Sequence, residues 1–133
     1  MTILRQILRP EDLQRVQAKF NFPIGEVPCE WGKTDGKLNR VASARSVGLF
    51  SSKGKIIFDP TDWPSAWADM GDPLVRETLF HELFHLSQFR RGLFYRLKIK
   101  YWNATLEYGI PPDIKRPHEI EAHKMGHELA QNW

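Results

Sequence analysis

The spacing of apolar residues near the start of the chain predicts one short helix followed by a turn-rich passage. Within residues 10–20, Leu13, Val16 and Phe20 recur at helical spacing and fall on one face, which is typical of a helix packed on a core. Residues 21–28 contain asparagine, glycine and two prolines, which favour turns. We therefore expect a helix and then a loop in this part of the chain.

Two later stretches predict strands. Residues 41–50 and 55–58 read as strands, and the intervening Ser51-Ser52-Lys53-Gly54 suits a hairpin connection. Residues 59–64, with two prolines, then end the regular structure. We expect a small antiparallel or mixed sheet, in which residues 46–50 and 55–58 are the candidates for an edge that could receive an extended peptide.

The clearest helical pattern lies between residues 72 and 92. Asp72 is a residue type favoured at helix N-caps, Pro73 fits the first helical position, and Gly92 favours a stop. The residues between them are largely apolar at mixed helical spacings, so the pattern predicts a mostly buried helix. A further helix is expected to begin near Pro117.

Residues 81–85, inside the first of these two helices, read His-Glu-Leu-Phe-His. Positions i and i+4 of an α-helix lie one above the other, so His81 and His85 present two imidazoles on one face. This spacing suits two nitrogen ligands of a tetrahedral Zn²⁺ ion, and Glu82 follows beside the position that a catalytic site leaves open. The sequence therefore predicts a zinc site on this helix.

The third zinc ligand is expected from the helix that begins near Pro117, because a catalytic zinc ion usually has three protein ligands. All five histidines of the chain lie in these two helical segments: His81, His85, His118, His123 and His127. The candidates for the third ligand are Glu119, Glu121, His118 and His123. The two glutamates lie about 200° apart around a helix, so both cannot reach one metal ion.

The HExxH run and the downstream Pro-His-Glu-Ile-Glu-Ala segment together resemble the gluzincin metallopeptidases, most of all their compact bacterial and phage members. In that family a glutamate on a second helix is the third zinc ligand. The resemblance implies that this ligand is Glu119, three residues before the small Ala122 that lets two helices approach. His123 stands where many relatives carry an aspartate. A histidine as third ligand, His118 or His123, would instead resemble the SprT-like proteases.

The resemblance implies a zincin-like α+β fold, in which a small sheet packs on the HExxH helix, and a zinc-dependent metallopeptidase. Zinc held by the two histidines and Glu119 would activate a water molecule and polarise the scissile carbonyl, while Glu82 acts as general base and then as proton donor. Tyr108 and His123 are candidates to stabilise the oxyanion. The alternative is a catalytically idle zinc-binding interaction domain, such as a toxin component or a nucleic-acid-associated adaptor. The carboxylate of Glu82 favours the enzyme, because a purely structural site gains nothing from it.

Composition limits the class of protein. The 133 residues suffice for one domain with a real core, so we expect a single domain over residues 1–133. No stretch approaches the roughly 20 apolar residues of a membrane span, and the N-terminus lacks the apolar segment of a signal peptide. The single cysteine, Cys29, excludes an internal disulfide and is expected to pack as a small buried residue. These features are typical of a cytoplasmic protein.

Residues 89–102 combine cations with aromatic residues: Arg90, Arg91, Arg96, Lys98 and Lys100 alternate with Phe94, Tyr95, Tyr101 and Trp102. One interpretation is an anionic partner, either nucleic acid or a membrane surface. The other is a helix with its aromatic side chains in the core and its cations in water. The net charge of the chain is only +3, so we favour the second interpretation and expect a peptide or protein substrate as the partner.

Overall fold

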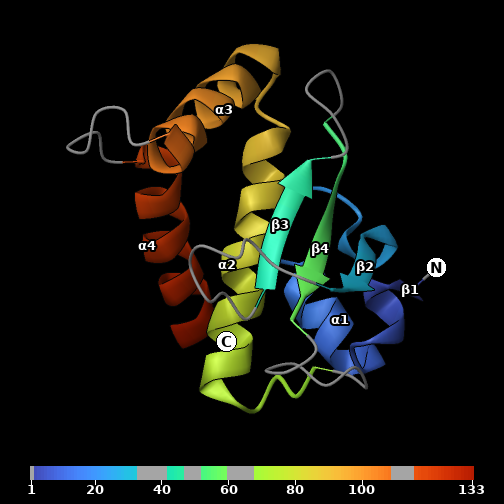
Figure 1. The fold of residues 1–133 in the computed structure, drawn as a ribbon. Helices are drawn as coiled ribbons and strands as arrows, with labels where there is room; N and C mark the ends of the chain where they lie inside the picture. The colour runs from blue at the N-terminus through green and yellow to red at the C-terminus, as the bar shows by residue number, and fades with distance from the viewer. Residues whose placement is uncertain (1, 33–41, 47–51, 60–67, 109–115) are drawn as a thin grey trace.

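The computed structural model describes residues 2–32, 42–46, 52–59, 68–108 and 116–133. In chain order, these residues form β1 (Thr2–Ile3), the 3-10 helix η1 (Leu4–Gln6), α1 (Pro10–Gln17), the 3-10 helix η2 (Ile24–Glu26), β2 (Pro28–Trp31), β3 (Ala42–Ser46), β4 (Gly54–Phe58), α2 (Pro73–Phe89), α3 (Leu93–Tyr108) and α4 (Pro117–Gln131). The chain is therefore an α+β protein, as expected. Helix α2 packs against the sheet on one side and against α4 on the other (Figure 1).

The sheet is mixed, with the strand order β1-β2-β4-β3. The short β1 pairs with β2 in antiparallel orientation, β2 and β4 are parallel, and β4 and β3 are antiparallel. In the β3–β4 pair, Ala44 lies opposite Ile56 and Ala42 opposite Phe58. The expected pairing of the two sequence segments is confirmed, although residues 47–51 of the predicted strand and its connection lie outside the described residues.

The prediction that residues 55–58 could form an open edge is wrong. These residues belong to β4, which pairs with β2 on one side and with β3 on the other. Ile56, Ile57 and Phe58 are all buried, which is typical of a strand covered on both faces. Among the described strands, the edge beside α2 is β3, of which only Ser46 belongs to the predicted segment 46–50.

The N-terminal part of the chain differs from the prediction in two respects. Helix α1 ends at Gln17, three residues earlier than expected, and residues 28–31 form β2 where a loop was predicted to end. A strand of four residues and a strand of two are too short to show an alternating pattern, so the sequence offered no signal for either. Cys29 in β2 is buried as expected, and burial raises the pKa of its thiol to about 12.

Helix α2 begins and ends as its sequence predicts. The Asp72 side chain accepts a hydrogen bond of 2.9 Å from the backbone N–H of Leu74, and Pro73 occupies the first helical position. The helix ends at Phe89, and Gly92 has a φ of +120°, a conformation that favours glycine. This turn connects α2 to α3.

The apolar core lies between the sheet and α2. Phe58 of β4 and Leu79, Phe80 and Leu83 of α2 are fully buried in one cluster. Phe80 stacks on Phe20 with ring centroids 6.2 Å apart. Because Phe80 points into this core, the next residues along the helix turn their side chains toward α4 and toward β3.

Helix α4 approaches α2 through a row of small residues. Ala122 and Ala130 are buried with Gly126 between them, at intervals of four residues that place all three on one helical face. A Cβ atom built on Gly126 would lie 2.9 Å from the Cα atom of His81. The two helix backbones are therefore in direct contact at His81.

Helix α3 is covered on one face only. Ile99 is buried, and Tyr95 and Trp102 pack partly against the core. Phe94 and Tyr101 are exposed, so the expectation that the aromatic residues of this segment lie in the core is wrong for these two. Within the described part of the chain, we find no helix with the length and apolar character needed to cross a membrane.

The contact at Gly126 predicts that Gly126→Ala destabilises the fold. Alanine is the better helix former by about 1 kcal/mol, but the added methyl group meets backbone, which cannot rotate away. Overpacking of this kind costs about 1–3 kcal/mol, so we expect a net loss in the free energy of unfolding, measured by urea denaturation.

Gly32→Ala is the matched control, because a Cβ atom at Gly32 would meet nothing within 4 Å. We expect this variant to stay within about 0.5 kcal/mol of the parent protein. Equal stability of Gly126→Ala and the parent protein would contradict the tight helix contact.

Candidate metal centre

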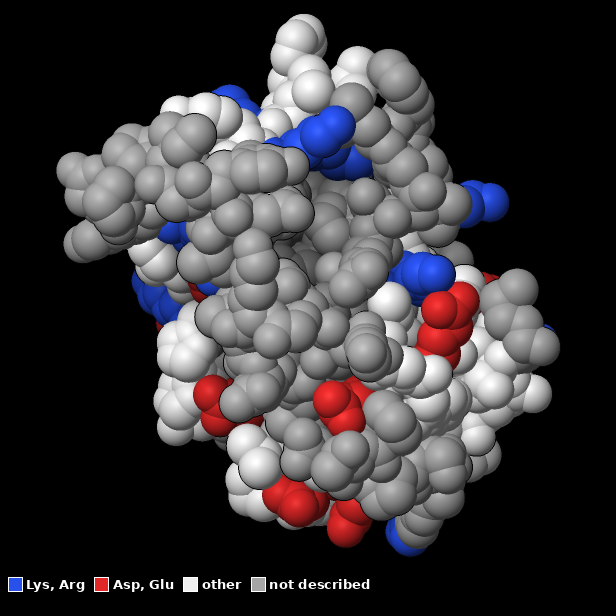
Figure 2. All heavy atoms as spheres, viewed as in Figure 1, with Lys and Arg blue, Asp and Glu red and all other residues white. Residues whose placement is uncertain are grey.

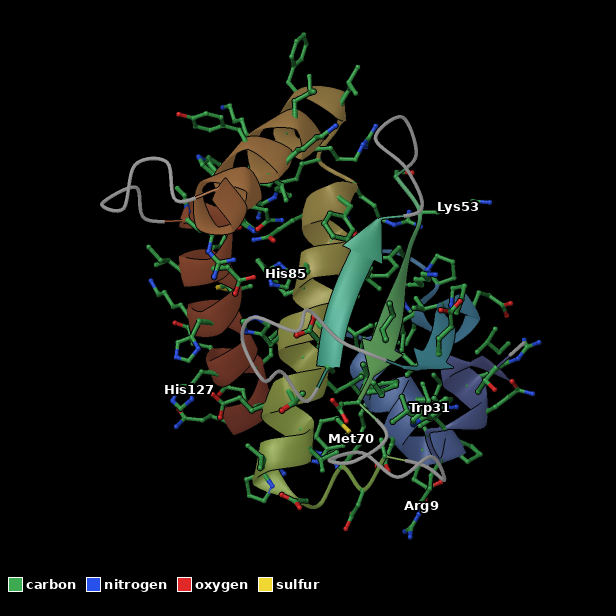
Figure 3. The ribbon with its side chains drawn as sticks, in the orientation of Figure 1. Arg9, Trp31, Lys53, Met70, His85 and His127 are labelled. Carbon is green, nitrogen blue, oxygen red and sulfur yellow. The ribbon has the colours of Figure 1, made fainter. Side chains whose placement is uncertain are left out.

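Three predicted ligand side chains converge between α2 and α4. His81 and His85 lie one turn apart on α2, and their Nε2 atoms are 3.1 Å apart. Glu119 comes from the first turn of α4, and its Oε1 lies 2.8 Å from Nε2 of His85 while its Oε2 lies 3.5 Å from Nε2 of His81. Figure 3 shows the imidazole of His85 between the two helices. The helix spacing and the α2–α4 contact together assemble this group.

The donor set of the group fits a metal ion. Two imidazole nitrogens and a carboxylate are the ligands of many zinc sites, and all three ligand atoms lie within 4.8 Å of one another. Ligands at the usual zinc distances are about 3.3 Å apart in a tetrahedral site, and the three separations given above lie on both sides of that value. His81, His85 and Glu119 could therefore hold a metal ion.

Gln88 orients the imidazole of His85. Nδ1–H of His85 donates to Oε1 of Gln88 over 2.8 Å, which leaves Nε2 as the nitrogen that faces Glu119. The amide nitrogen of Gln88 donates to the carbonyl of His118 over 2.9 Å and to Oε1 of Glu121 over 3.0 Å. Both partners are on α4, so the fully buried Gln88 connects a ligand on one helix to the backbone of the other.

Glu82 is buried beside the group, with 4 % of its surface exposed. Its Oε2 accepts a hydrogen bond of 2.6 Å from the backbone N–H of Ala44 in the edge strand β3. Burial raises the pKa of the Glu82 carboxyl, and the charge of Glu119 adds to this, against the opposing effects of the two imidazoles and of Ala44 N–H. The carboxylate is thus held in one orientation with an increased affinity for a proton.

Burial is the largest cause and opposes a charged His85, but the hydrogen bonds to Glu119 and Gln88 and the charges of Glu119 and Glu82 together outweigh it, so the pKa of His85 is raised. A proton on His85 Nε2 lies between the candidate ligand atoms, in the place that a metal ion would occupy. A metal ion would therefore compete with a proton for this nitrogen, and its binding would be favoured as the pH increases.

The group borders a pocket of about 300 Å³ that is open to solvent. His81, Glu82 and Glu119 form one side of this pocket, and Ala42 of β3 and His123 of α4 form part of the rest. Two of the three predicted ligands, His81 and Glu119, and the predicted base therefore line the same space, into which a small part of a substrate could extend.

The rival candidates for the third ligand occupy other environments. Glu121 forms an ion pair of 2.7 Å with Arg91 in addition to its hydrogen bond with Gln88, so it is committed to a structural role. His118 is buried, and its ring stacks on Trp102 with centroids 5.5 Å apart. Its Nε2 is 4.0 Å from Oε1 of Glu119, so His118 adjoins the group without belonging to it.

The remaining histidines and the predicted oxyanion residues are placed differently. The ring centroid of His123 lies 6.3 Å from that of His81, at the pocket. His127 is half-exposed on α4, and its Nδ1 is 3.3 Å from a carboxylate oxygen of Glu77 on α2. The side chain of Tyr108, the other oxyanion candidate, lies outside the described residues.

Three contributors to the site were missed in the sequence. Gln88 follows the second histidine by three residues, which places it on the same helical face, and that spacing could have identified it. Gly126 lies four residues after Ala122, and the repeated small residue was the available signal. The contribution of Ala44 had no local signal, because it depends on where the edge strand packs against α2.

Comparison of the chain with protein-family models, with curated proteins and with solved structures gave no match. The assignment of the site therefore depends on the arrangement of its own residues.

Glu119 and Glu121 provide a direct test of the metal centre. We expect Glu119→Ala to lower zinc affinity by more than about a hundredfold, because it leaves two imidazoles and solvent, whereas Glu121→Ala should change it less than about tenfold. Competition with a chromophoric chelator measures both variants side by side. Equal retention of zinc would remove Glu119 from the ligand set.

Gln88→Leu should weaken zinc binding by about 10- to 100-fold, because the partner that fixes the His85 ring is lost. The exposed Gln131 on α4 offers the matched control Gln131→Leu, which should bind zinc as the parent protein does. Chelator competition should be run at a temperature where circular dichroism shows all variants folded. Unchanged affinity of Gln88→Leu would show that Gln88 does not position the ligand.

Proposed function

We propose that this protein is a zinc-dependent metallopeptidase with a zincin-like fold of the gluzincin type. The observation that carries the proposal is the convergence of His81, His85 and Glu119 on one point, with Glu82 buried beside them at an open pocket. Both HExxH histidines face the carboxylate of a second helix, and a small mixed sheet packs on the HExxH helix. These are the relations that the resemblance to gluzincins implies.

In the proposed reaction, the zinc ion and the side chains of the protein would have separate roles. A bound zinc ion would supply a Lewis acid that polarises a carbonyl and acidifies water. Glu82 would take a proton from the attacking water and give it to the leaving amine. Burial, the largest cause of its raised pKa, acts with or without a cation and makes the Glu82 carboxylate a stronger base. His123 is retained as the candidate for the oxyanion because it lines the same pocket.

The edge strand β3 is the proposed site for an extended peptide. The backbone N–H of Ala44 points away from β4, because it donates to Glu82, so this side of β3 faces the metal centre. Ala42, two residues earlier on the same side, lines the pocket. A peptide added along β3 by β-augmentation would therefore pass Glu82 and the three ligands.

The pocket favours an enzyme over a catalytically idle metal site. A structural zinc site closes its fourth position with a protein ligand, whereas this group borders an open pocket of about 300 Å³. Within the described residues, three side chains form the group. A buried carboxylate at the pocket has a clear use in hydrolysis and no use in a closed site.

The test is peptide hydrolysis by the zinc-loaded protein, assayed with a fluorogenic peptide library. Glu82→Gln should keep the fold and zinc affinity and lower turnover by about 10²- to 10⁴-fold, the usual contribution of a general base. Glu77→Gln is the matched control, because Glu77 lines the same pocket and should be dispensable. Full turnover by Glu82→Gln would contradict the mechanism. Zinc binding without cleavage of any peptide would favour the idle binding domain.

A further inference from the structure

An exposed apolar stripe runs along the outer face of α3. Phe94 is 81 % exposed, Leu97 41 % and Tyr101 57 %. At about 100° per residue these three side chains fall within about 60° of one another around the helix, so they form one line. They are three of the five large apolar side chains that are exposed in the described part of the chain.

The stripe is not the core-facing side of the helix. Tyr95, Ile99 and Trp102 cover that side: Ile99 is buried, and the two aromatic rings pack on one another and on the core with centroids 6.0 Å apart. The apolar residues of α3 thus exceed what the fold can bury, and the excess faces outward.

Cations flank the stripe. Lys98 lies about 40° to one side of Phe94 around the helix, and Lys100 lies on the other side of the stripe, about 60° from Leu97. The sequence has no Asp or Glu between Glu82 and Glu107. On the face drawn in Figure 2, Lys and Arg atoms predominate at the end where Figure 1 draws α3, and most of the Asp and Glu atoms lie toward the other end.

We propose that α3 binds the surface of an anionic lipid bilayer. Phe94, Leu97 and Tyr101 would enter the boundary between headgroups and acyl chains, and Lys98 and Lys100 would reach the lipid phosphates on both sides. A helix that lies in the interface needs this arrangement of a central apolar line with cations at its margins. Binding to the bilayer would use only the outer face of α3 and would leave in place the contacts that hold the helix in the fold.

The distribution of charge favours a bilayer over a nucleic acid. A phosphate backbone is held by cations at the centre of the contact, whereas the centre of this face is apolar and includes the aliphatic Leu97, which offers no ring for base stacking. The net charge of +3 is also small for attraction that acts at long range. Binding to a bilayer uses both the flanking cations and the central apolar line, because the two contribute together.

The proposed surface lies apart from the metal pocket. The pocket is lined by residues of β3, α2 and α4, and those of α2 lie between Leu74 and Glu82, whereas α3 follows the C-terminal end of α2 and contributes no described residue to the lining. The proposal therefore does not depend on the proposed peptidase activity, and the two can fail separately.

Sedimentation of the full-length protein with lipid vesicles tests the proposal. The protein should bind vesicles that contain one third phosphatidylglycerol in phosphatidylcholine and bind phosphatidylcholine alone much more weakly. Phe94→Ser should lower affinity about tenfold or more, and Lys98→Gln about fivefold. The matched controls are Leu74→Ser, which removes an apolar side chain that is 69 % exposed, and Lys124→Gln, which removes an exposed lysine of α4. Both controls should bind as the parent protein does.

Three results would overturn the proposal. The first is absence of binding to anionic vesicles, and the second is equal vesicle binding by Phe94→Ser and the parent protein. The third is binding of a single-stranded oligonucleotide that is tighter than binding to anionic vesicles and that depends on the same residues. Sedimentation velocity without lipid is run in parallel, because a dimer that dissociates on Phe94→Ser, together with no vesicle binding, would assign the stripe to a second copy of the chain.

Discussion

The backbone contact between Gly126 and His81 is the constraint on which the candidate metal centre depends. Glu119 lies two turns before Gly126 on α4, so the distance between the helix axes at Gly126 sets how far the carboxylate lies from both imidazoles. Ala122 and Ala130, one turn before and one turn after Gly126 on the same face of α4, are also small and buried. Larger residues in this row would widen the gap, and the ligand atoms would separate although none of the ligands had changed.

A polar connection complements this apolar one. Gln88 joins the His85 ring to the carbonyl of His118, and Glu121 joins Gln88 to Arg91. Small residues thus bring the helices together, while the amide group of Gln88 fixes the rotation of a ligand between them. Both the oxygen and the nitrogen of the Gln88 amide have hydrogen-bond partners. The buried amide can therefore orient the His85 ring without the cost of an unsatisfied polar atom.

The sequence could predict those parts of the structure that depend on local spacing. His81 and His85 follow from the i, i+4 rule, and the start of α2 follows from Asp72 and Pro73. The ligand role of Glu119 was implied by the resemblance to gluzincins, and local spacing could not imply it, because it depends on how a second helix packs against α2. Ala44 and the edge position of β3 could not be predicted, because pairing in the sheet joins segments through contacts that no short pattern records.

The position of α3 between the two ligand-bearing helices has a consequence for the chain entropy. His85 and Glu119 are separated by 33 residues that include α3, so an ion held by both would close a loop around that helix. Closing a flexible loop of this length removes about 3 kcal/mol of conformational freedom from the unfolded chain. A bound ion would thereby act as a cross-link, and local opening of α3 would be opposed from both of its ends.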